Sequence, residues 1–258
     1  MNIFRRVRTL CTTVLVLSIA FGYRVAAADP PPSPQDMLIG VSLAGPEFGT
    51  QLTEFSNRTP GRFGREYTYP NADTIAYFAS SGIDLIRLPF RWERLQPELG
   101  GELNPVEMRR IQGVTRTALK NGVFVILDLH NYGRYRLEQQ GVVRECVIDQ
   151  RVDDHVPVSR EHFQDFWKRM ALEFRGDRSI VGYGLMNEPH DMGDSDWKTI
   201  SQAAVDVIRL YDKETAVVVA GDDWSSAERF VEANGQKPWI RDPANHVVYE
   251  AHCYFDSD

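Results

Sequence analysis

Polar and aromatic residues recur directly after short apolar runs in this sequence, where the strands of a parallel sheet would place functional groups. Six segments fit this description: residues 47–48, 87–92, 128–132, 187–190, 222–224 and 252–254. Each segment is a weak signal alone. Because the carboxyl ends of parallel strands meet at one edge of a sheet, their repetition after six runs predicts a single site at that edge.

Glu188 is the candidate for acid–base chemistry. A carboxyl group partly buried at the mouth of a barrel, beside an amide and aromatic rings, is expected to keep its proton near neutral pH, as a general acid must. The adjacent Asn187 could hydrogen-bond a sugar hydroxyl near the reacting carbon. The alternative is that Asn-Glu-Pro at 187–189 only begins a helix, because Asn caps helices and Pro suits a first turn. We favour the chemical interpretation.

The other residues of these segments have structural alternatives. Arg87 could hold an ionised group of the site or form a salt bridge, and His130 and His252 could be satisfied by internal hydrogen bonds. Aromatic rings can stack on a sugar or belong to the core, and the candidates are Trp92, Tyr132, Tyr135, Trp197 and Trp224. Asp128, His130 and His252 could be zinc ligands, but the sequence lacks the usual H-x-H or H-E-x-x-H spacing. We therefore expect no metal and no other cofactor.

Six β-rich apolar runs must supply the strands that position these residues. They cover residues 38–43, 83–88, 123–129, 180–186, 216–220 and 246–251. Their apolar residues are continuous rather than alternating, which indicates strands covered on both faces, as in a parallel sheet.

Helical patterns separate these strands. One is predicted over 104–122, where Asn104 is the N-cap. Another lies between Ser159 and Gly176, and its aromatic residues are spaced so that they share one face and belong to the core. Further patterns cover residues 75–79 and 200–211 (with Asp194 or Ser195 as cap), and a weaker one covers 225–233.

Alternating strands and helices fit two α/β architectures. One is a doubly wound sheet, and the other is a TIM (β/α)8 barrel, of which this chain would hold about the first six strands. Gly40 and Gly45 lack the G-x-G-x-x-G spacing of a dinucleotide site. The composition, 43% hydrophobic and 25% charged, is that of a globular protein and excludes disorder, collagen and coiled coil.

Residues 1–28 are predicted to be a secretory signal peptide. Arginines precede an apolar run that is too short to span a bilayer, and three alanines supply a cleavage pattern before Asp29. We therefore expect a secreted protein, extracellular or periplasmic. A Pro-rich lead-in over 29–37 would precede a barrel over 38–258. Export permits a disulfide between Cys146 and Cys253, but the sequence does not show that they meet.

The chain is acidic, with a net charge of −7. Four arginines lie in residues 1–28, so the rest of the chain carries −11. An acidic surface repels phosphate backbones and anionic lipids, which favours a neutral partner over nucleic acid or membrane.

Taken together, these segments resemble glycoside hydrolase family 5, and most closely its secreted endo-β-1,4-glucanases. The likeness lies in residues 40–45, 87–90, 129–135, 186–191, 221–224 and 252–258. The resemblance implies a TIM barrel that cleaves β-1,4-glucan chains internally with retention of anomeric configuration.

The resemblance also implies roles for single residues. Glu188 would be the acid/base, Asn187 would bind the sugar 2-hydroxyl before the cleaved bond, and Arg87 would keep the nucleophile ionised. The remaining substrate-binding candidates are His130 and Asn131 after the third strand, His252 and Tyr254 beside the nucleophile, and Trp224 as a platform for a glucosyl ring.

One departure from the family is large. Its nucleophilic Glu follows a seventh strand, which would lie beyond Asp258, and neither Glu250 nor Asp222 and Asp223 match it. A retaining site needs two carboxyl groups about 5 to 5.5 Å apart. We therefore expect a C-terminally truncated chain, with its first and last strands as unpaired edges, that folds poorly and lacks hydrolase activity.

Other activities stay open at this point. The chain could be a β-mannanase or exo-β-1,3-glucanase of the same family, or a catalytically dead carbohydrate-binding barrel. In each case the expected partner is a polysaccharide or oligosaccharide, foremost a β-glucan. We expect no nucleic acid partner, no membrane after signal cleavage, and a monomer when the barrel is complete.

Overall fold

The strands that carry the candidate site are all present where the apolar runs predict them. The computed structural model describes residues 38–255. The strands are β1 (Gly40–Ser42), β2 (Leu85–Phe90), β3 (Phe124–Leu129), β6 (Ile180–Gly184), β7 (Ala216–Ala220) and β8 (Val247–Glu250). The expected signal peptide and lead-in lie outside the described residues.

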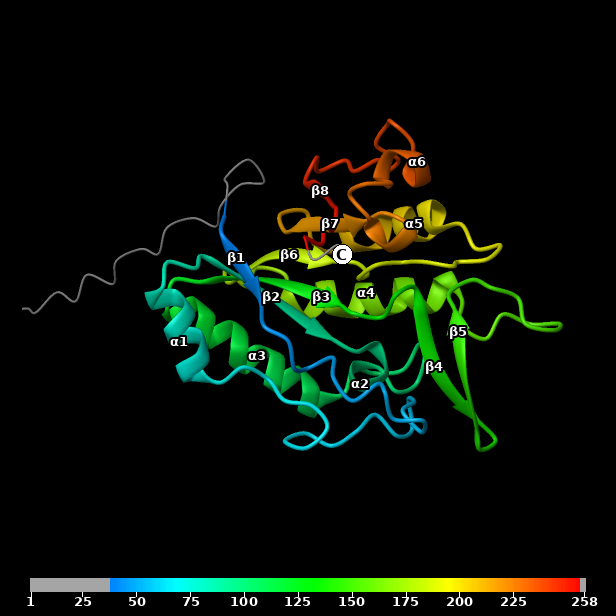
Figure 1. Cartoon of the computed structure of the whole chain (residues 1–258), viewed down its shortest axis with the longest axis horizontal. Coiled ribbons are helices and arrows are strands. Elements are labelled where there is room, and N and C mark those ends of the chain that lie inside the picture. The colour runs from blue at the N-terminus through cyan, green and yellow to red at the C-terminus, as the bar shows by residue number, and fades with distance from the viewer. Residues whose placement is uncertain (1–37, 256–258) are drawn as a thin grey trace, which may run out of the picture. The chain divides into compact units, whose positions relative to one another are not determined.

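The order of the strands decides between the two architectures. All six are parallel, and their order along the sheet, β1-β2-β3-β6-β7-β8, is their order along the chain (Figure 1). A doubly wound sheet would reverse its order at a switch point. The described part is therefore an incomplete (β/α)8 barrel with six parallel strands, and β1 and β8 each pair on one side only within residues 38–255.

Helices connect the strands and pack in neighbouring pairs, α1 on α3 and α4 on α5. Their bounds are α1 (Ala72–Ser80), α2 (Trp92–Leu95), α3 (Pro105–Lys120), α4 (Arg160–Phe174), α5 (Trp197–Arg209) and α6 (Phe230–Asn234), with a 3-10 turn η1 at Asp223–Ser225. The short α2 follows β2 directly and was not predicted.

The ends of the helices follow their capping residues. Asn104 caps α3 as predicted, because its Oδ1 accepts from the backbone N–H of Val106 at 2.9 Å. The predicted cap of α5 is wrong, since Asp196 performs this role and accepts from Lys198 N at 3.0 Å. The last helix starts at Phe230, later than predicted, because Ser225 has φ of 54° and Ser226 forms a bridge to His252.

The structure also contains a two-stranded hairpin that the sequence patterns do not predict. β4 (Arg134–Gln139) and β5 (Val142–Val147) are antiparallel and form a separate sheet. Gln140 and Gly141 join them with φ of 53° and 78°, the conformation of a two-residue hairpin turn. The pattern was obscured because the hairpin interrupts the alternation of strands and helices and has no Asn-Gly or Asp-Gly at its turn.

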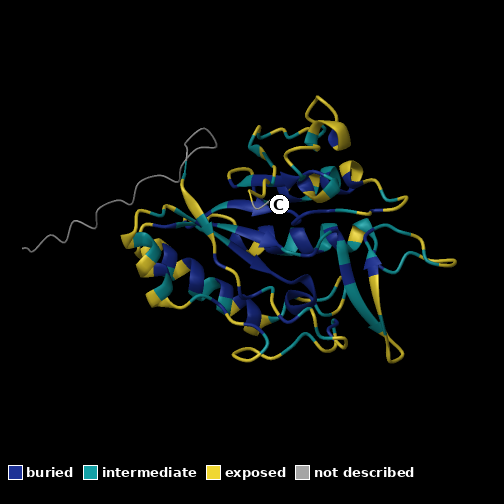
Figure 2. Cartoon of the chain, viewed as in Figure 1, coloured by how far each residue is buried: buried dark blue, intermediate teal, exposed yellow. Residues whose placement is uncertain are grey.

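The core lies between the sheet and the inner faces of the helices (Figure 2). The predicted apolar face of α4 is buried, as confirmed for Phe163, Phe166, Trp167, Met170, Ala171 and Phe174. Buried indole N–H groups find backbone partners: Trp167 donates to Leu185 O at 3.2 Å and Trp197 to Ala220 O at 2.8 Å. These bonds tie α4 and α5 to the ends of β6 and β7, where the site lies.

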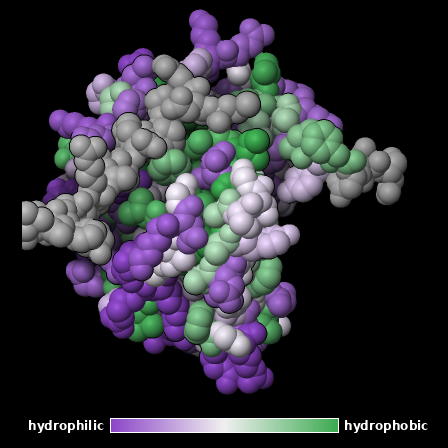
Figure 3. Space-filling view, turned by 90° about the vertical axis from the view of Figure 1, so that its left-hand side faces the viewer, coloured by the Kyte–Doolittle hydropathy of each residue, from purple (hydrophilic) through white to green (hydrophobic). Residues whose placement is uncertain are grey.

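The outer surface is mixed in character. On the face shown in Figure 3, hydrophilic side chains are prominent, and hydrophobic ones gather mainly in its upper middle part. None of the described helices has the length and apolarity that a membrane span requires.

Asn104→Ala should lower the free energy of unfolding by about 1 kcal/mol, because the first turn of α3 loses its side-chain acceptor. Urea unfolding followed by circular dichroism measures the change. Asn104→Asp is the matched control, since its carboxylate still accepts at this position. Equal stability of the Ala and Asp variants would contradict the capping role.

Candidate active site

The carboxyl ends of the strands bring most of the predicted site residues together. The cluster consists of Arg87 on β2, His130 after β3, Asn187 and Glu188 after β6, and His252 and Tyr254 after β8. Trp224 joins Glu188, His252 and Tyr254 in lining a hollow at the same edge. Asn131 is the exception and lies deeper in the structure.

The Arg87 guanidinium lies at the centre of this cluster. Its Nη2 donates to Asn187 Oδ1 at 2.7 Å and lies 2.9 Å from Glu250 Oε1. Asp128 Oδ1 is 3.0 Å away, an ion pair without the alignment of a hydrogen bond. Burial acts to lower the pKa of Arg87, but the surrounding carboxylates raise it above its ordinary value, so the side chain stays charged.

Glu188 lies beside His252 and Tyr254 in the same cluster. Its side chain is buried, with only 8% of the residue exposed. Oε1 lies 2.5 Å from His252 Nδ1 and accepts from the Tyr254 hydroxyl at 3.1 Å. The backbone of Glu188 has φ of 43°, and no helix includes residues 187–189. The helix-start alternative for Asn-Glu-Pro is therefore wrong.

His252 connects two carboxylates. Its Nδ1 faces Glu188, and its Nε2 lies 2.6 Å from Glu250 Oε1. Where both carboxylates are ionised, each can only accept a hydrogen bond, so both ring nitrogens carry a proton. The bonds to Glu188 and then to Glu250 raise the pKa of His252 to about 9, although burial opposes this. The ring is thus an imidazolium at neutral pH.

The charge of His252 corrects one expectation about Glu188. Burial does act to raise the pKa of Glu188, as the sequence predicts. However, the hydrogen bonds and positive charge of His252, together with the Tyr254 hydroxyl, outweigh burial and bring the pKa below its ordinary value. The prediction that Glu188 keeps its proton near neutral pH is therefore wrong for the described arrangement.

His130 is oriented by hydrogen bonds on both ring nitrogens. Nδ1 lies 2.7 Å from Asp128 Oδ2, and Nε2 lies 3.2 Å from the Tyr132 hydroxyl. Since Asp128 is also the ion-pair partner of Arg87, this histidine belongs to the same charged network.

The aromatic candidates separate into core and surface. Trp92, Tyr135 and Trp197 are buried and are core residues. Trp224 is 42% exposed, and one face of its indole lies on the His190 ring, with centroids 3.3 Å apart and planes 9° apart. Tyr132 approaches the indole edge-on at 6.2 Å. Of the predicted platforms, only Trp224 and the half-buried Tyr132 remain near the hollow.

The Asn131 side chain is buried beneath the site and bonds to other residues of the protein. Its Oδ1 accepts from Trp92 N at 2.8 Å, and its Nδ2 donates to Glu93 Oε2 at 2.9 Å and to Arg134 O at 3.0 Å. The residue is only 1% exposed, so this position does not support the expected contact with substrate.

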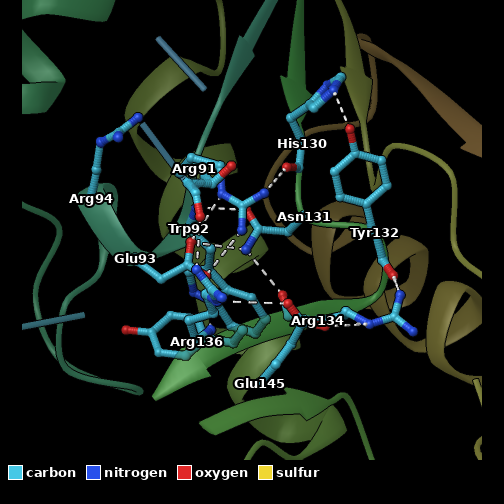
Figure 4. A network of polar contacts seen from close by, with 12 residues as sticks. Arg91, Trp92, Glu93, Arg94, His130, Asn131, Tyr132, Arg134, Arg136 and Glu145 are labelled. Carbon is cyan, nitrogen blue, oxygen red and sulfur yellow. Dashed lines mark hydrogen bonds and ion pairs between the residues drawn. The ribbon is translucent and has the colours of Figure 1, made fainter. Parts of the chain in front are cut away.

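Glu93 is a buried residue that the sequence did not single out. Its carboxylate accepts from Asn131, from the Arg136 backbone N–H at 2.8 Å, and from Arg91 at 3.2 Å (Figure 4). Arg91 in turn donates to His130 O. A lone glutamate after a strand carries no signal of such burial, because its partners come from distant segments.

The part of the chain that the structure describes contains neither a metal-binding cluster nor a disulfide. There, no set of three or more His, Cys, Asp and Glu side chains is arranged to hold a metal ion. Cys146 is buried in β5, Cys253 is exposed beside the hollow, and both are free thiols.

Comparison with known proteins adds a family and several relatives. The family Cellulase (glycosyl hydrolase family 5) matches residues 42–258. Endo-beta-1,4-glucanase B of Emericella nidulans is 28% identical over 95% of this chain and 67% of its own length.

Two solved structures are similar in both sequence and fold. Pseudomonas stutzeri endoglucanase Cel5A in complex with cellobiose is 37% identical, with a TM-score of 0.74 over 88% of this chain and 64% of that one. Endo-beta-1,4-glucanase Xac0029 from Xanthomonas axonopodis pv. citri is 33% identical, with a TM-score of 0.71 over 86% of this chain and 66% of that one. The chain spans about two thirds of the length of these proteins.

NMR titration should show His252 losing its proton near pH 9. Glu188→Gln should move this titration to lower pH, because the largest contribution to the raised pKa is removed. Glu228→Gln, an exposed change in the same hollow, is the control. Unchanged titration of His252 in the Glu188 variant would contradict the ion pair.

The same pair should make stability depend on pH. Because the His252 pKa is raised on folding, its contribution is complete below the ordinary value of 6.5 and is lost as pH rises through about 9. The pKa of Glu188 is lowered on folding, so the contribution of Glu188 to stability is lost as the pH falls through its pKa in the folded state. Urea midpoints measured across pH should therefore fall on both sides, and His252→Gln should flatten the alkaline side.

Proposed function

This chain belongs to glycosyl hydrolase family 5, and from that premise we propose that it carries the acid/base part of a retaining endo-β-1,4-glucanase. The observation that supports this most is the placement of Glu188, buried against His252 and Tyr254 in a hollow that Trp224 also lines. A positioned carboxyl group beside a flat exposed ring suits hydrolysis of a sugar polymer.

In this proposal Glu188 protonates the departing sugar oxygen and later takes a proton from the attacking water. Asn187 uses Oδ1 to accept from Arg87, so its Nδ2 is the group that donates to a sugar hydroxyl at the reacting ring. His130 and His252 line the same edge of the sheet, and Trp224 stacks on a neighbouring glucosyl ring through its exposed face.

The proposal places the nucleophile outside the residues described above. Retention requires a second carboxyl group about 5 to 5.5 Å from the first. Glu250 is the last residue of β8 and does not lie in a loop after a strand, so we propose that a glutamate beyond residue 258, in a longer form of the chain, supplies it. An ionised group at that distance would raise the pKa of Glu188, because like charges oppose each other's ionisation. Glu188 would then carry the proton that it lacks in the described arrangement.

The proposed substrate is a cellulose-type β-glucan. The relatives are named endoglucanases, and one solved relative is a complex with cellobiose. Secretion is part of the proposal and rests on the signal-peptide pattern of residues 1–28, which lie outside the described residues. The acidic net charge agrees with a neutral polysaccharide partner, and we propose a monomer for the longer form.

Trp224→Ala should weaken the binding of cellotetraose to this chain by about tenfold, because stacking on an aromatic face contributes about 1 to 1.5 kcal/mol. Calorimetric titration measures the affinity, and Tyr77→Ala, an exposed aromatic on α1, is the matched control. Tighter binding of a β-mannan or β-1,3-glucan tetrasaccharide would favour the other activities of the family, and no saturable binding of any would contradict the proposal.

Glu188→Gln in a form extended to the length of its relatives should lose far more activity on unactivated glucans than on substrates with good leaving groups. The reason is that only the former need a proton on the departing oxygen, a contribution of about 10² to 10⁴ in rate. Steady-state rates on cellotetraose and an aryl cellobioside make the comparison. Equal losses on both would argue against an acid/base role.

A further inference from the structure

The geometry points to His190 and Arg134 as positioning residues that fix the ring of Trp224 and leave one of its faces for a sugar. This inference rests on the proposed function, because it concerns how a glucosyl ring would be received next to Glu188. Neither residue was assigned a role from the sequence.

The stack between His190 and Trp224 covers one face of the indole. The rings are nearly parallel, with planes 9° apart and centroids 3.3 Å apart, so nothing can be inserted between them. Tyr132 meets both rings edge-on, at 6.1 Å from His190 and 6.2 Å from Trp224. The face of Trp224 that lies on His190 is therefore not part of its exposed surface. A sugar can stack only on the opposite face.

Arg134 holds the imidazole in place from the hairpin. Its Nη1 lies 3.0 Å from His190 Nε2, and its Nη2 donates to His190 O at 2.9 Å. Because a guanidinium can only donate, Nε2 must accept, and the ring proton is on Nδ1. Nδ1 then donates to Asp191 Oδ2 at 2.8 Å. Both ring nitrogens are engaged, so the ring cannot flip without losing two hydrogen bonds.

The same contacts connect the platform to the acid/base. His190 is two residues from Glu188, and the backbone N–H of Trp224 donates to Pro189 O at 3.0 Å. Arg134 also donates to Tyr132 O at 2.6 Å. One guanidinium on β4 therefore fixes the loop after β3 and the loop after β6, and through His190 it fixes the indole after β7. The distance between the stacked sugar and the proton donor is set by this connection.

Two variants separate the stack from the hydrogen bonds. His190→Phe keeps a flat ring under the indole but removes the bond to Arg134, whereas His190→Ala removes both. ¹⁵N relaxation of the indole N–H of Trp224, assigned with Trp224→Phe, reports its order in the free chain. We expect an ordered indole in the wild type, a mobile one in His190→Ala, and recovery of most of the order in His190→Phe.

Cellotetraose affinity gives the second measurement. His190→Ala should weaken binding about tenfold, and His190→Phe should restore it to within about threefold of the wild type. Arg134→Met should act like a milder His190→Ala, and Arg116→Met, an exposed arginine on α3, is the control for a lost charge. Circular dichroism checks that each variant is folded.

The outcomes distinguish this inference from the proposed function. An indole that stays as ordered in folded His190→Ala as in the wild type would overturn the positioning role, whatever binds. If the wild type binds no oligosaccharide, the proposed function fails, and the order of the Trp224 indole in the free chain still decides whether His190 positions it.

Discussion

A single guanidinium nitrogen, Nη2 of Arg87, joins the ends of strands that are far apart in sequence. It contacts Asp128 on β3, Asn187 after β6 and Glu250 on β8. A half-buried charge is stable when it is paired and hydrogen-bonded, so these three partners constrain where the strands can end. His252 extends this network, because it links Glu250 to Glu188. The position and ionisation of the proposed acid/base thus depend on a network that begins at Arg87.

The sequence was informative wherever a property is local. Continuous apolar runs predict the six strands, Asn104 predicts the start of α3, and the strand-end segments converge because parallel strands require it. The sequence was uninformative where a residue's pKa or burial depends on partners that are distant in the chain. The pKa of Glu188 is lowered by a histidine 64 positions later in the chain. The burial of Asn131 depends on Glu93 and on the β4–β5 hairpin, which a pattern of alternating helices and strands does not predict.

Unusual backbone conformations gather at the edge of the sheet that carries the site. Tyr132, Glu188 and the run Asp223–Ser225 all have positive φ, in the loops that follow β3, β6 and β7. Such conformations cost non-glycine residues about 1 to 2 kcal/mol each, so contacts must hold them. Ser225 provides one example, since its hydroxyl donates to Glu250 O at 2.5 Å and accepts from Gly221 N at 2.9 Å.

Because the strands are arranged along the sheet in the order in which they are translated, each βα unit can dock on the one before it as the chain emerges from the ribosome. Most of the hydrophobic core would then form early, from contacts between successive units. The groups that lower the pKa of Glu188 would be added after β7, since His252 and Tyr254 follow β8. A nascent chain would therefore build its scaffold before its chemistry.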